Sequence, residues 1–324
     1  GLFSLCSGGF FSFRGLRMIF FLVAASFLLG VAETFVIVTG GIDLSVGFVM
    51  GFASIVSAKL VVYFAGGLGW GEPAAIIAGA LLTMVIGLIP GLVNGFLVAY
   101  LRVPPFIATF SMLGIAHGVS ELLIQGIPAK NLPHLAGVIG NGHLLYITAG
   151  KGVSFFSRPE VARGTRVVEI IPNIVVITFV FVAIFAFVLK RTRYGQHTYA
   201  IGGNRDAATR AGIKTKPHLM SIYMLSSLFS SIAGIVYMLQ YVTGKADAGA
   251  VLLLDSIAAV VIGGASLYGG HGSVWRTILG CLIIATLETG LRIMGIPTFD
   301  KYIMVGLILI FAVLMDQFFP ERVH

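Results

Sequence analysis

Residues 172–189 read PNIVVITFVFVAIFAFVL, an almost uninterrupted apolar run, and residues 190–217 follow directly with KRTRYGQHTYAIGGNRDAATRAGIKTKP. A helix of the first length crosses a hydrocarbon layer of about 30 Å. The second segment carries seven Lys or Arg residues against one acid, Asp206. Because short loops rich in Lys and Arg stay on the cytoplasmic side of a membrane, this pair predicts a spanning helix that ends in a cytoplasmic loop.

The composition extends this prediction to the whole chain. Of 324 residues, 57% are apolar and 10% are charged, whereas a soluble domain carries about 25% charged residues. The mean hydropathy is +1.00. These values exclude a soluble enzyme and a nucleic-acid-binding protein, and we interpret the net charge of +8 as a consequence of basic cytoplasmic loops. The two cysteines and seven histidines show no metal-ligand spacing, so no metal site is expected.

Nine apolar segments are long enough for membrane spans. They lie at residues 18–38, 44–65, 73–100, 104–125, 172–189, 218–242, 252–268, 274–291 and 301–319. Runs of this length without alternating polar residues exclude the strands of a membrane β-barrel, and helices then satisfy every backbone group in lipid. The predicted fold is an all-α polytopic membrane bundle of about nine transmembrane helices, with residues 18–319 as one transmembrane domain.

The loops between the segments give the predicted orientation. Residues 190–217 are placed in the cytoplasm, and residues 126–171, which precede one span, are placed on the extracytoplasmic side. Counting spans from there puts the N-terminus outside and the C-terminal tail, residues 320–324, inside. The chain begins at Gly1 without a methionine, so residues 1–17 are interpreted as an N-terminal remnant or an altered start.

Four strings carry a family resemblance. They are FVIVTGGIDLSVG at 35–47, NGFLVAYLRVPPFIATFSML at 94–113, RTRYGQHTYAIGGNRDAATRAGI at 191–213 and LDSIAAVVIGGASLYGGHGS at 254–273. In this order, from about residue 15 to residue 319, the chain resembles the ribose-type permease subunits of bacterial ABC sugar importers, in the branched binding-protein-dependent transport permease family. Members of that family usually have ten membrane helices, and the match here starts at the second.

The resemblance implies a multi-pass permease subunit of the bacterial inner membrane that imports a monosaccharide or related polyol. The implied partners are a cytoplasmic ABC ATPase, a periplasmic sugar-binding protein, a second permease copy (the same chain or a paralogue) and the lipid membrane. The sequence has no G-x-x-x-x-G-K-[ST] motif, since Gly244-Lys245 is followed by Ala246. We therefore expect no enzyme activity, no cofactor bound by this chain, and ATP-Mg on the partner ATPase.

The basic loop contains the strongest candidate element. Asn204 is placed to cap a short helix, Asp206 lies in its first turn, and Gly212 ends it. In the family that the chain resembles, this element is the coupling helix that sits in a cleft of the ATPase. The candidate coupling residues are Gly203, Asn204, Arg205, Asp206, Ala207, Ala208, Arg210 and Gly212. The alternative is a solvated basic loop that only fixes topology.

The string at 35–47 holds a second candidate element. Its motif residues are Gly40, Gly41, Asp43, Ser45 and Gly47. An acid at the start of a helix caps free N–H groups, so a structural cap is the favoured interpretation of Asp43, with gating or ATPase contact as the alternative. A similar glycine pattern recurs at Gly263, Gly264, Leu267 and Gly270, which allows a parallel internal repeat.

Polar and aromatic residues within the spans are candidates for the substrate pathway. The selected residues are Asn94, Phe106, Thr109, Ser111, Asp255 and Glu288, with Glu33, Tyr100, His117 and Glu121 as further candidates. Ionisable groups near the bilayer centre are costly unless they face a cavity or a partner. For each residue, hydrogen bonding between helices is the alternative. An ion- or proton-coupled secondary carrier, using buried acids such as Glu33 and Glu288, is the alternative function.

Overall fold

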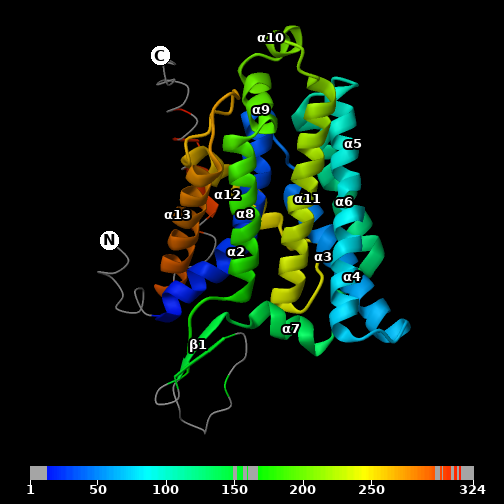
Figure 1. Cartoon of the computed structure of the whole chain (residues 1–324), viewed down its shortest axis with the longest axis vertical. Helices are drawn as coiled ribbons and strands as arrows, with labels where there is room; N and C mark the ends of the chain where they lie inside the picture. Colours follow the sequence, from blue (N-terminus) through cyan, green and yellow to red (C-terminus); the bar gives the residue numbers. More distant parts are fainter. Residues whose placement is uncertain are drawn as a thin grey trace.

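The computed structural model describes residues 13–148, 152–155, 159, 167–295, 300, 302–307, 310, 311 and 314. Over these residues the chain forms a bundle of helices that run along the long axis of the molecule (Figure 1). Seven spans are long and apolar enough to cross a membrane. The predicted polytopic helical bundle is therefore confirmed.

The seven spans are built from eight helices. They are α2 (Phe13–Val38), α3 (Val46–Val62, continued by the π-helical turn η1, Tyr63–Gly67), α4 (Glu72–Ile86) with α5 (Leu88–Ala99), α6 (Pro105–Ile124), α8 (Asn173–Arg191), α11 (Thr215–Tyr241) and α13 (Val274–Ile293). Shorter helices are α7 (His134–Asn141), α9 (Arg193–Gly203), α10 (Arg205–Arg210) and α12 (Ala250–Ile262).

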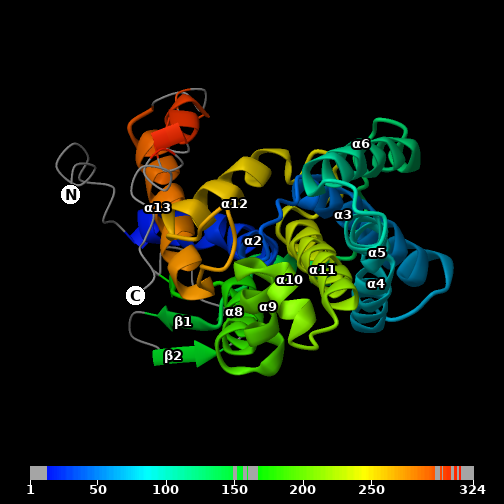
Figure 2. The ribbon, with the colours of Figure 1, turned by 90° about the horizontal axis from the view of Figure 1, so that it is seen from above.

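Helix α2 lies at the centre of the bundle, where α8, α11, α12 and α13 pack around it (Figure 2). Apolar burial gives little drive for helices to associate in lipid, so small residues that allow close packing hold such bundles together. A side-chain carbon at Gly30 would lie 2.9 Å from Cγ2 of Thr277 in α13. Helices α4, α6 and α8 lie at the edge and expose many large apolar side chains, as helices in contact with lipid do.

Two predicted spans differ from the helices that the structure shows. Residues 73–100 form two helices, α4 and α5, which meet at Gly87. A side-chain carbon at Gly87 would lie 1.8 Å from Oγ of Ser231 in α11, so this position requires glycine. The predicted span 252–268 is the 13-residue helix α12, which is too short to cross a bilayer alone. The predicted span 301–319 lies largely outside the described residues.

The two ends of the bundle carry different structures (Figure 1). At one end, α9 and α10 follow α8. At the other end, α7 is followed by a small antiparallel sheet in the order β2-β1-β3, built from β1 (Leu145–Thr148), β2 (Gly152–Phe155) and β3 (Val167–Glu169). This sheet is an addition that the all-α prediction did not contain. The described parts of segment 126–171 thus lie at the opposite end of the bundle from segment 190–217.

Candidate functional site

The short helix predicted in the basic loop is present as α10. Asn204 caps it, because its Oδ1 accepts a hydrogen bond of 2.9 Å from the backbone N–H of Ala207. The helix ends at Arg210, and Gly212, two residues further on, has a φ of +85° in the left-handed region that favours glycine. Every residue from Gly203 to Gly212 is exposed except Ala208. Helix α10 therefore stands out from the end of the bundle (Figure 1).

Ala208 anchors α10 to the bundle. It packs in a small apolar cluster with Ala99 of α5, Ile201 of α9 and Leu219 of α11. Arg205 lies at the start of the same helix, and its guanidinium reaches the Ala99 carbonyl at 3.5 Å. The exposed face of α10 therefore carries Asp206, Ala207 and Arg210, while its one buried side chain is only a methyl group.

Helix α9, which precedes α10, packs against the end of the central helix α2. A side-chain carbon at Gly202 would lie 1.8 Å from the carbonyl oxygen of Val38, the last residue of α2. The same carbonyl accepts a hydrogen bond of 2.8 Å from the backbone N–H of Gly270. The end of α2, the end of α9 and the glycine-rich loop before α13 therefore meet in direct backbone contact.

Tyr199 adds a side-chain bond to this contact. Its hydroxyl donates to the carbonyl oxygen of Gly272 at 2.7 Å. Burial raises the pKa of the Tyr199 hydroxyl, and the charge of Arg276 opposes that shift. The hydroxyl thus stays protonated and remains a donor at physiological pH.

The two glycine motifs found in the sequence lie side by side at this end. Helices α2 and α12 run in the same direction (Figure 1) and pack against each other, and both are followed by a Gly-Gly pair. A side-chain carbon at Gly269 would lie 2.8 Å from the backbone nitrogen of Gly40. Gly40 has a φ of +78°, whereas Gly263, its counterpart in the second motif, has a φ of −68°. The parallel internal repeat therefore stays a prediction.

Asp43 lies at a fully buried junction between α2 and α3. Its Oδ1 accepts hydrogen bonds from the backbone N–H and the hydroxyl of Ser45, and its Oδ2 accepts one of 2.7 Å from the hydroxyl of Ser226 in α11. Asp43, Ser45 and Ser226 each have no exposed surface. The carboxylate therefore joins the segment that leads into α3 to α11, and no surface of it is available to another protein.

The motif glycines allow this junction to be tight. A side-chain carbon at Gly41 would lie 2.6 Å from the hydroxyl oxygen of Tyr223, and one at Gly47 would lie 2.3 Å from the carbonyl oxygen of Gly249. Both neighbours are held by buried segments. Larger residues at these two positions would therefore push α3 away from the segments it contacts.

Two of the selected pathway residues belong to the same junction. Asn94 of α5 donates through Nδ2 to the hydroxyl of Ser45 at 3.1 Å. Thr109 of α6 donates to the carbonyl oxygen of Ile42 at 3.2 Å and to that of Pro105 at 2.9 Å. Both side chains are buried. The structure thus places them at an interhelical contact, the alternative that the sequence left open.

Asp255 and Glu288 line a cavity of about 220 Å³ between α2, α11, α12 and α13. Gln240, Tyr237 and Arg292 line it as well, and the Oε1 of Glu288 accepts a hydrogen bond of 2.7 Å from Nη2 of Arg292. The cavity can therefore offer both donors and acceptors. The sequence selected both acids but gave no indication that they share one space.

Four further pathway candidates lie on α6. Phe106 is 58% exposed and stacks on Phe110, with ring centroids 5.9 Å apart. Ser111 is exposed, and its hydroxyl donates to the carbonyl oxygen of Ile107 within the same helix. His117 and Glu121 form an ion pair further along α6, with Nε2 and Oε1 3.6 Å apart. None of these residues lines the cavity at Asp255.

Among the buried acids, Glu33 of α2 stands apart. It is fully buried, and neither carboxyl oxygen forms a hydrogen bond of normal geometry within the described part of the chain. The carboxylate of Asp43 is the acid that interacts with it. Glu33 is a buried polar group inside the central helix rather than part of a lined space.

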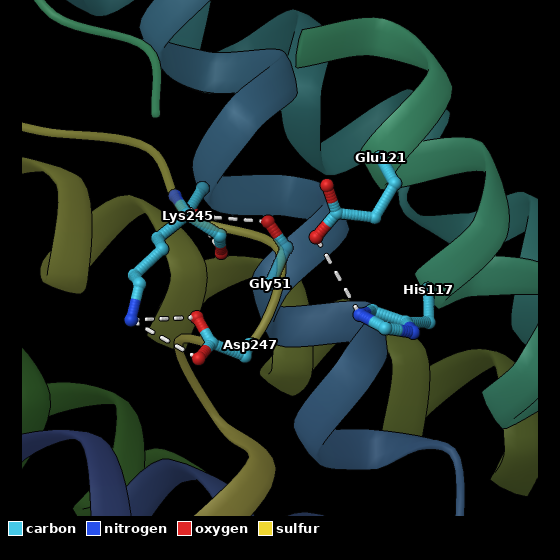
Figure 3. Close-up of polar contacts among 6 residues, drawn as sticks. Gly51, His117, Glu121, Lys245 and Asp247 are labelled. Carbon is cyan, nitrogen blue, oxygen red and sulfur yellow. Dashed lines mark hydrogen bonds and ion pairs between the residues drawn. The ribbon is translucent and has the colours of Figure 1, made fainter. Parts of the chain in front are cut away.

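Sequence reasoning did not select Lys245 and Asp247. Their side chains form an ion pair of 3.0 Å between α11 and α12, a segment that looked like an ordinary outer loop. The available signal was the pair Gly47 and Gly51 in α3, spaced as G-x-x-x-G, which permits close approach of another backbone. Figure 3 shows Lys245 and Asp247 beside Gly51, with His117 and Glu121 on the other side of the same helix segment.

Comparison with known proteins places the chain among transport proteins. A family model described as "Branched-chain amino acid transport system / permease component" matches residues 15–313. No solved structure matches the chain. The match to the family model covers all the described spans.

Individual relatives are similar over most of their length. The xylose transport system permease protein of Haemophilus influenzae is 33% identical over 95% of this chain and 90% of its own length. The fructose import permease protein of Rhizobium meliloti is 33% identical over 97% and 80%. The ribose import permease protein of Bacillus subtilis is 34% identical over 91% and 82%.

These matches confirm the family predicted from the four sequence strings, and with the seven apolar spans they make the chain a multi-pass inner-membrane protein. Its coverage of the relatives extends well beyond two thirds of their length. The chain belongs to the branched-chain amino acid transport system permease component family.

Proposed function

We propose that this chain is the membrane-spanning subunit of an ATP-driven importer that moves a monosaccharide or related polyol into the cell. The observation that carries the proposal is the similarity, at 33–34% identity along most of the chain, to permeases named for xylose, fructose and ribose. These relatives differ in the sugar that they are named for. The proposal therefore concerns the class of solute and not one sugar.

The energy for import comes from a separate ATPase in this proposal. The sequence has no G-x-x-x-x-G-K-[ST] motif, so ATP-Mg binds to the partner. A periplasmic binding protein delivers the sugar, and a second permease copy completes the assembly. The end of the bundle that carries α10 lies in the cytoplasm, because the basic loop 190–217 lies there.

Helix α10 is the contact for the ATPase. Its exposed face, with small Ala207 between Asp206 and Arg210, fits a groove and offers charges for pairing at the rim. Movement of α10 is passed on through α9, because Gly202 has no free space against Val38 at the end of α2. Since α2 lies at the centre of the bundle, a shift of its end changes the packing of the helices around it.

A pull-down of the ATPase from membranes tests this assignment. Replacing residues 203–212 by a Gly-Ser linker of equal length is expected to abolish association with the ATPase. The matched control is Lys130→Glu, an exposed charge change near the opposite end of the bundle, which should retain association. Retained association after replacement of 203–212 would contradict the proposal.

Uptake measurements distinguish the proposed importer from an ion-coupled carrier. We expect proteoliposomes that contain the permease, ATPase and binding protein to accumulate a labelled pentose or hexose only with internal ATP. Uptake driven by a pH gradient alone in ATP-depleted vesicles would instead support the carrier. Uptake of leucine but of no sugar would support an amino acid as the solute.

A further inference from the structure

The connection between α11 and α12 lies inside the membrane-spanning part of the bundle. Residues 242–249 run along α3, and the backbone N–H of Lys245 donates to the hydroxyl of Ser54 at 3.0 Å. That hydroxyl lies 3.1 Å from the carbonyl oxygen of Lys245. Ser54 lies in the interior of the 22-residue span Val46–Gly67, so this connection is not beyond the end of the helices.

Glycines of α3 bring this segment close. A side-chain carbon at Gly51 would lie 1.9 Å from the carbonyl oxygen of Ala246, and one at Gly47 would lie 2.3 Å from that of Gly249. Helix α12 begins directly after the segment and has only 13 residues. Non-helical backbone at this depth is tolerated only where protein buries it or where it lines a water-filled space.

The charged side chains of this region are not buried. Lys245 and Asp247 pair at 3.0 Å with side chains 47% and 50% exposed, and His117 and Glu121 are 43% and 44% exposed. Figure 3 shows the two pairs on either side of the same segment of α3. Charged groups inside a membrane face a cavity or a partner and not lipid.

The exposed surface of α6 continues from this cluster. Residues 106, 110, 117 and 121 recur at helical spacing, so Phe106 and Phe110 lie on the same face of α6 as His117 and Glu121. The ring of Phe48 in α3 contacts the His117 ring, with centroids 5.1 Å apart. This face of α6 therefore combines apolar rings with an imidazole and one carboxylate, while the ammonium group of Lys245 and the carboxylate of Asp247 come from the segment 242–249.

We propose that this face of α6 and the segment 242–249 form a wall of the water-filled solute passage and bind the passing solute, a neutral polyhydroxylated molecule. The carboxylates of Glu121 and Asp247 accept hydrogen bonds from its hydroxyl groups, and Lys245 donates to them. Phe110 lies 11 residues before Glu121 on α6, about 16 Å along the helix axis. The rings of Phe106 and Phe110 therefore meet the apolar side of the solute at a separate position along the wall. The ammonium group of Lys245 balances the charge of Asp247.

Water access along this wall is measurable without transport. In a background with C6S and C281A, single cysteines replace Glu121 and Asp247 in the full importer complex in membrane vesicles. The matched controls are Leu122→Cys and Phe187→Cys, at positions that are 79% and 62% exposed but apolar and outside the proposed wall. A membrane-impermeant methanethiosulfonate reagent then reports water access, because only the thiolate reacts.

We expect E121C and D247C to react at least about tenfold faster than L122C and F187C. Millimolar D-xylose, D-ribose or D-fructose, added with the binding protein and ATP, should slow the labelling of E121C and D247C. The labelling rates of L122C and F187C should not change. Equally slow labelling at all four positions would show that Glu121 and Asp247 do not face a water-filled passage. Fast labelling of E121C and D247C without protection by any of these sugars would show that the solute does not bind there.

This inference rests on the proposed function, and the two fail separately. Equal labelling of all four positions in a complex that still shows ATP-driven sugar uptake would contradict the proposed wall but not the proposed importer. Selective labelling in a complex without ATP-driven uptake would support water access along the wall but contradict the proposed importer. Labelling and uptake are therefore measured on the same vesicles.

Discussion

Helix α10 and the Asp43 junction differ in exposure and in the reach of the hydrogen bonds that their Asn204 and Asp43 side chains accept. The cap of α10 joins Asn204 to Ala207, three residues apart, while Asp43 accepts a hydrogen bond from Ser226, 183 residues away. One is exposed and the other has no exposed surface. An exposed element that is anchored mainly by one small buried side chain, Ala208, is suited to bind another protein, whereas a buried element with hydrogen bonds between helices is suited to fix the helices against each other.

Removal of the Asp43 carboxylate tests whether the buried junction holds the helices together, and it has the largest expected effect. Asp43→Ala leaves the buried hydroxyls of Ser45 and Ser226 without their acceptor. We expect a loss of about 3 kcal/mol or more in unfolding free energy, because buried hydrogen bonds to charged groups are the strong ones. Thermal unfolding of the purified protein in detergent, followed by loss of the monodisperse peak, measures this.

Asp206→Ala is the control for that measurement. Asp206 is exposed in α10, and its removal should change stability by no more than about 0.5 kcal/mol. If the two variants unfold at the same temperature, the Asp43 junction is not a structural centre of the bundle.

A second variant tests the contact between the two regions. In Gly202→Ala, the new methyl group meets the Val38 carbonyl, whereas in Gly203→Ala nothing lies within 4 Å. Overpacking of this kind costs about 1–3 kcal/mol. We expect G202A to keep the ATPase bound in a pull-down but to lose most of the stimulation of ATP hydrolysis by sugar-loaded binding protein, while G203A retains both. Normal stimulation of ATP hydrolysis in G202A would contradict the proposal that α9 passes the movement of α10 on to α2.

The smallest expected effect is at the cap of α10. Asn204→Ala removes the bond to the Ala207 N–H and should cost about 1 kcal/mol of local helix stability, as N-cap losses do. Affinity for the ATPase should fall by less than about tenfold. Asn204→Ser restores a capping oxygen, so a binding measurement should find it close to the natural residue. An equal loss in both variants would show that Asn204 acts other than as a cap.

The helical bundle and α10 were predictable because both rest on signals that are local in the sequence. Apolar runs near 20 residues predicted the spans, and Asn204, Asp206 and Gly212 predicted the short helix and its ends. The division of residues 73–100 at Gly87 has a local signal as well, because Pro90 has no N–H to donate to the carbonyl of Ile86, the last residue of α4. The close contact of Gly87 with Ser231 was not predictable, because Ser231 lies on a different helix and far away in the sequence.

The positions of the pathway candidates were predictable only in part. Asp255 and Glu288 line one cavity, yet Asn94 and Thr109 lie in the Asp43 junction and Phe106 and Ser111 lie on the surface of α6. Residue type shows that a polar group is costly in a membrane, but only packing decides which group satisfies it. For the same reason the sequence did not reveal that residues 242–249 lie beside the interior of α3.

The central claim is that the ATPase meets this chain at α10, and site-specific photocrosslinking in the assembled complex tests it most directly. A photoreactive residue is placed at Ala207, exposed on α10, or at Lys130, exposed near the opposite end of the bundle. The account predicts a crosslink to the ATPase from position 207 and none from position 130. A crosslink from position 130, or none from position 207 in a complex that contains the ATPase, would contradict it.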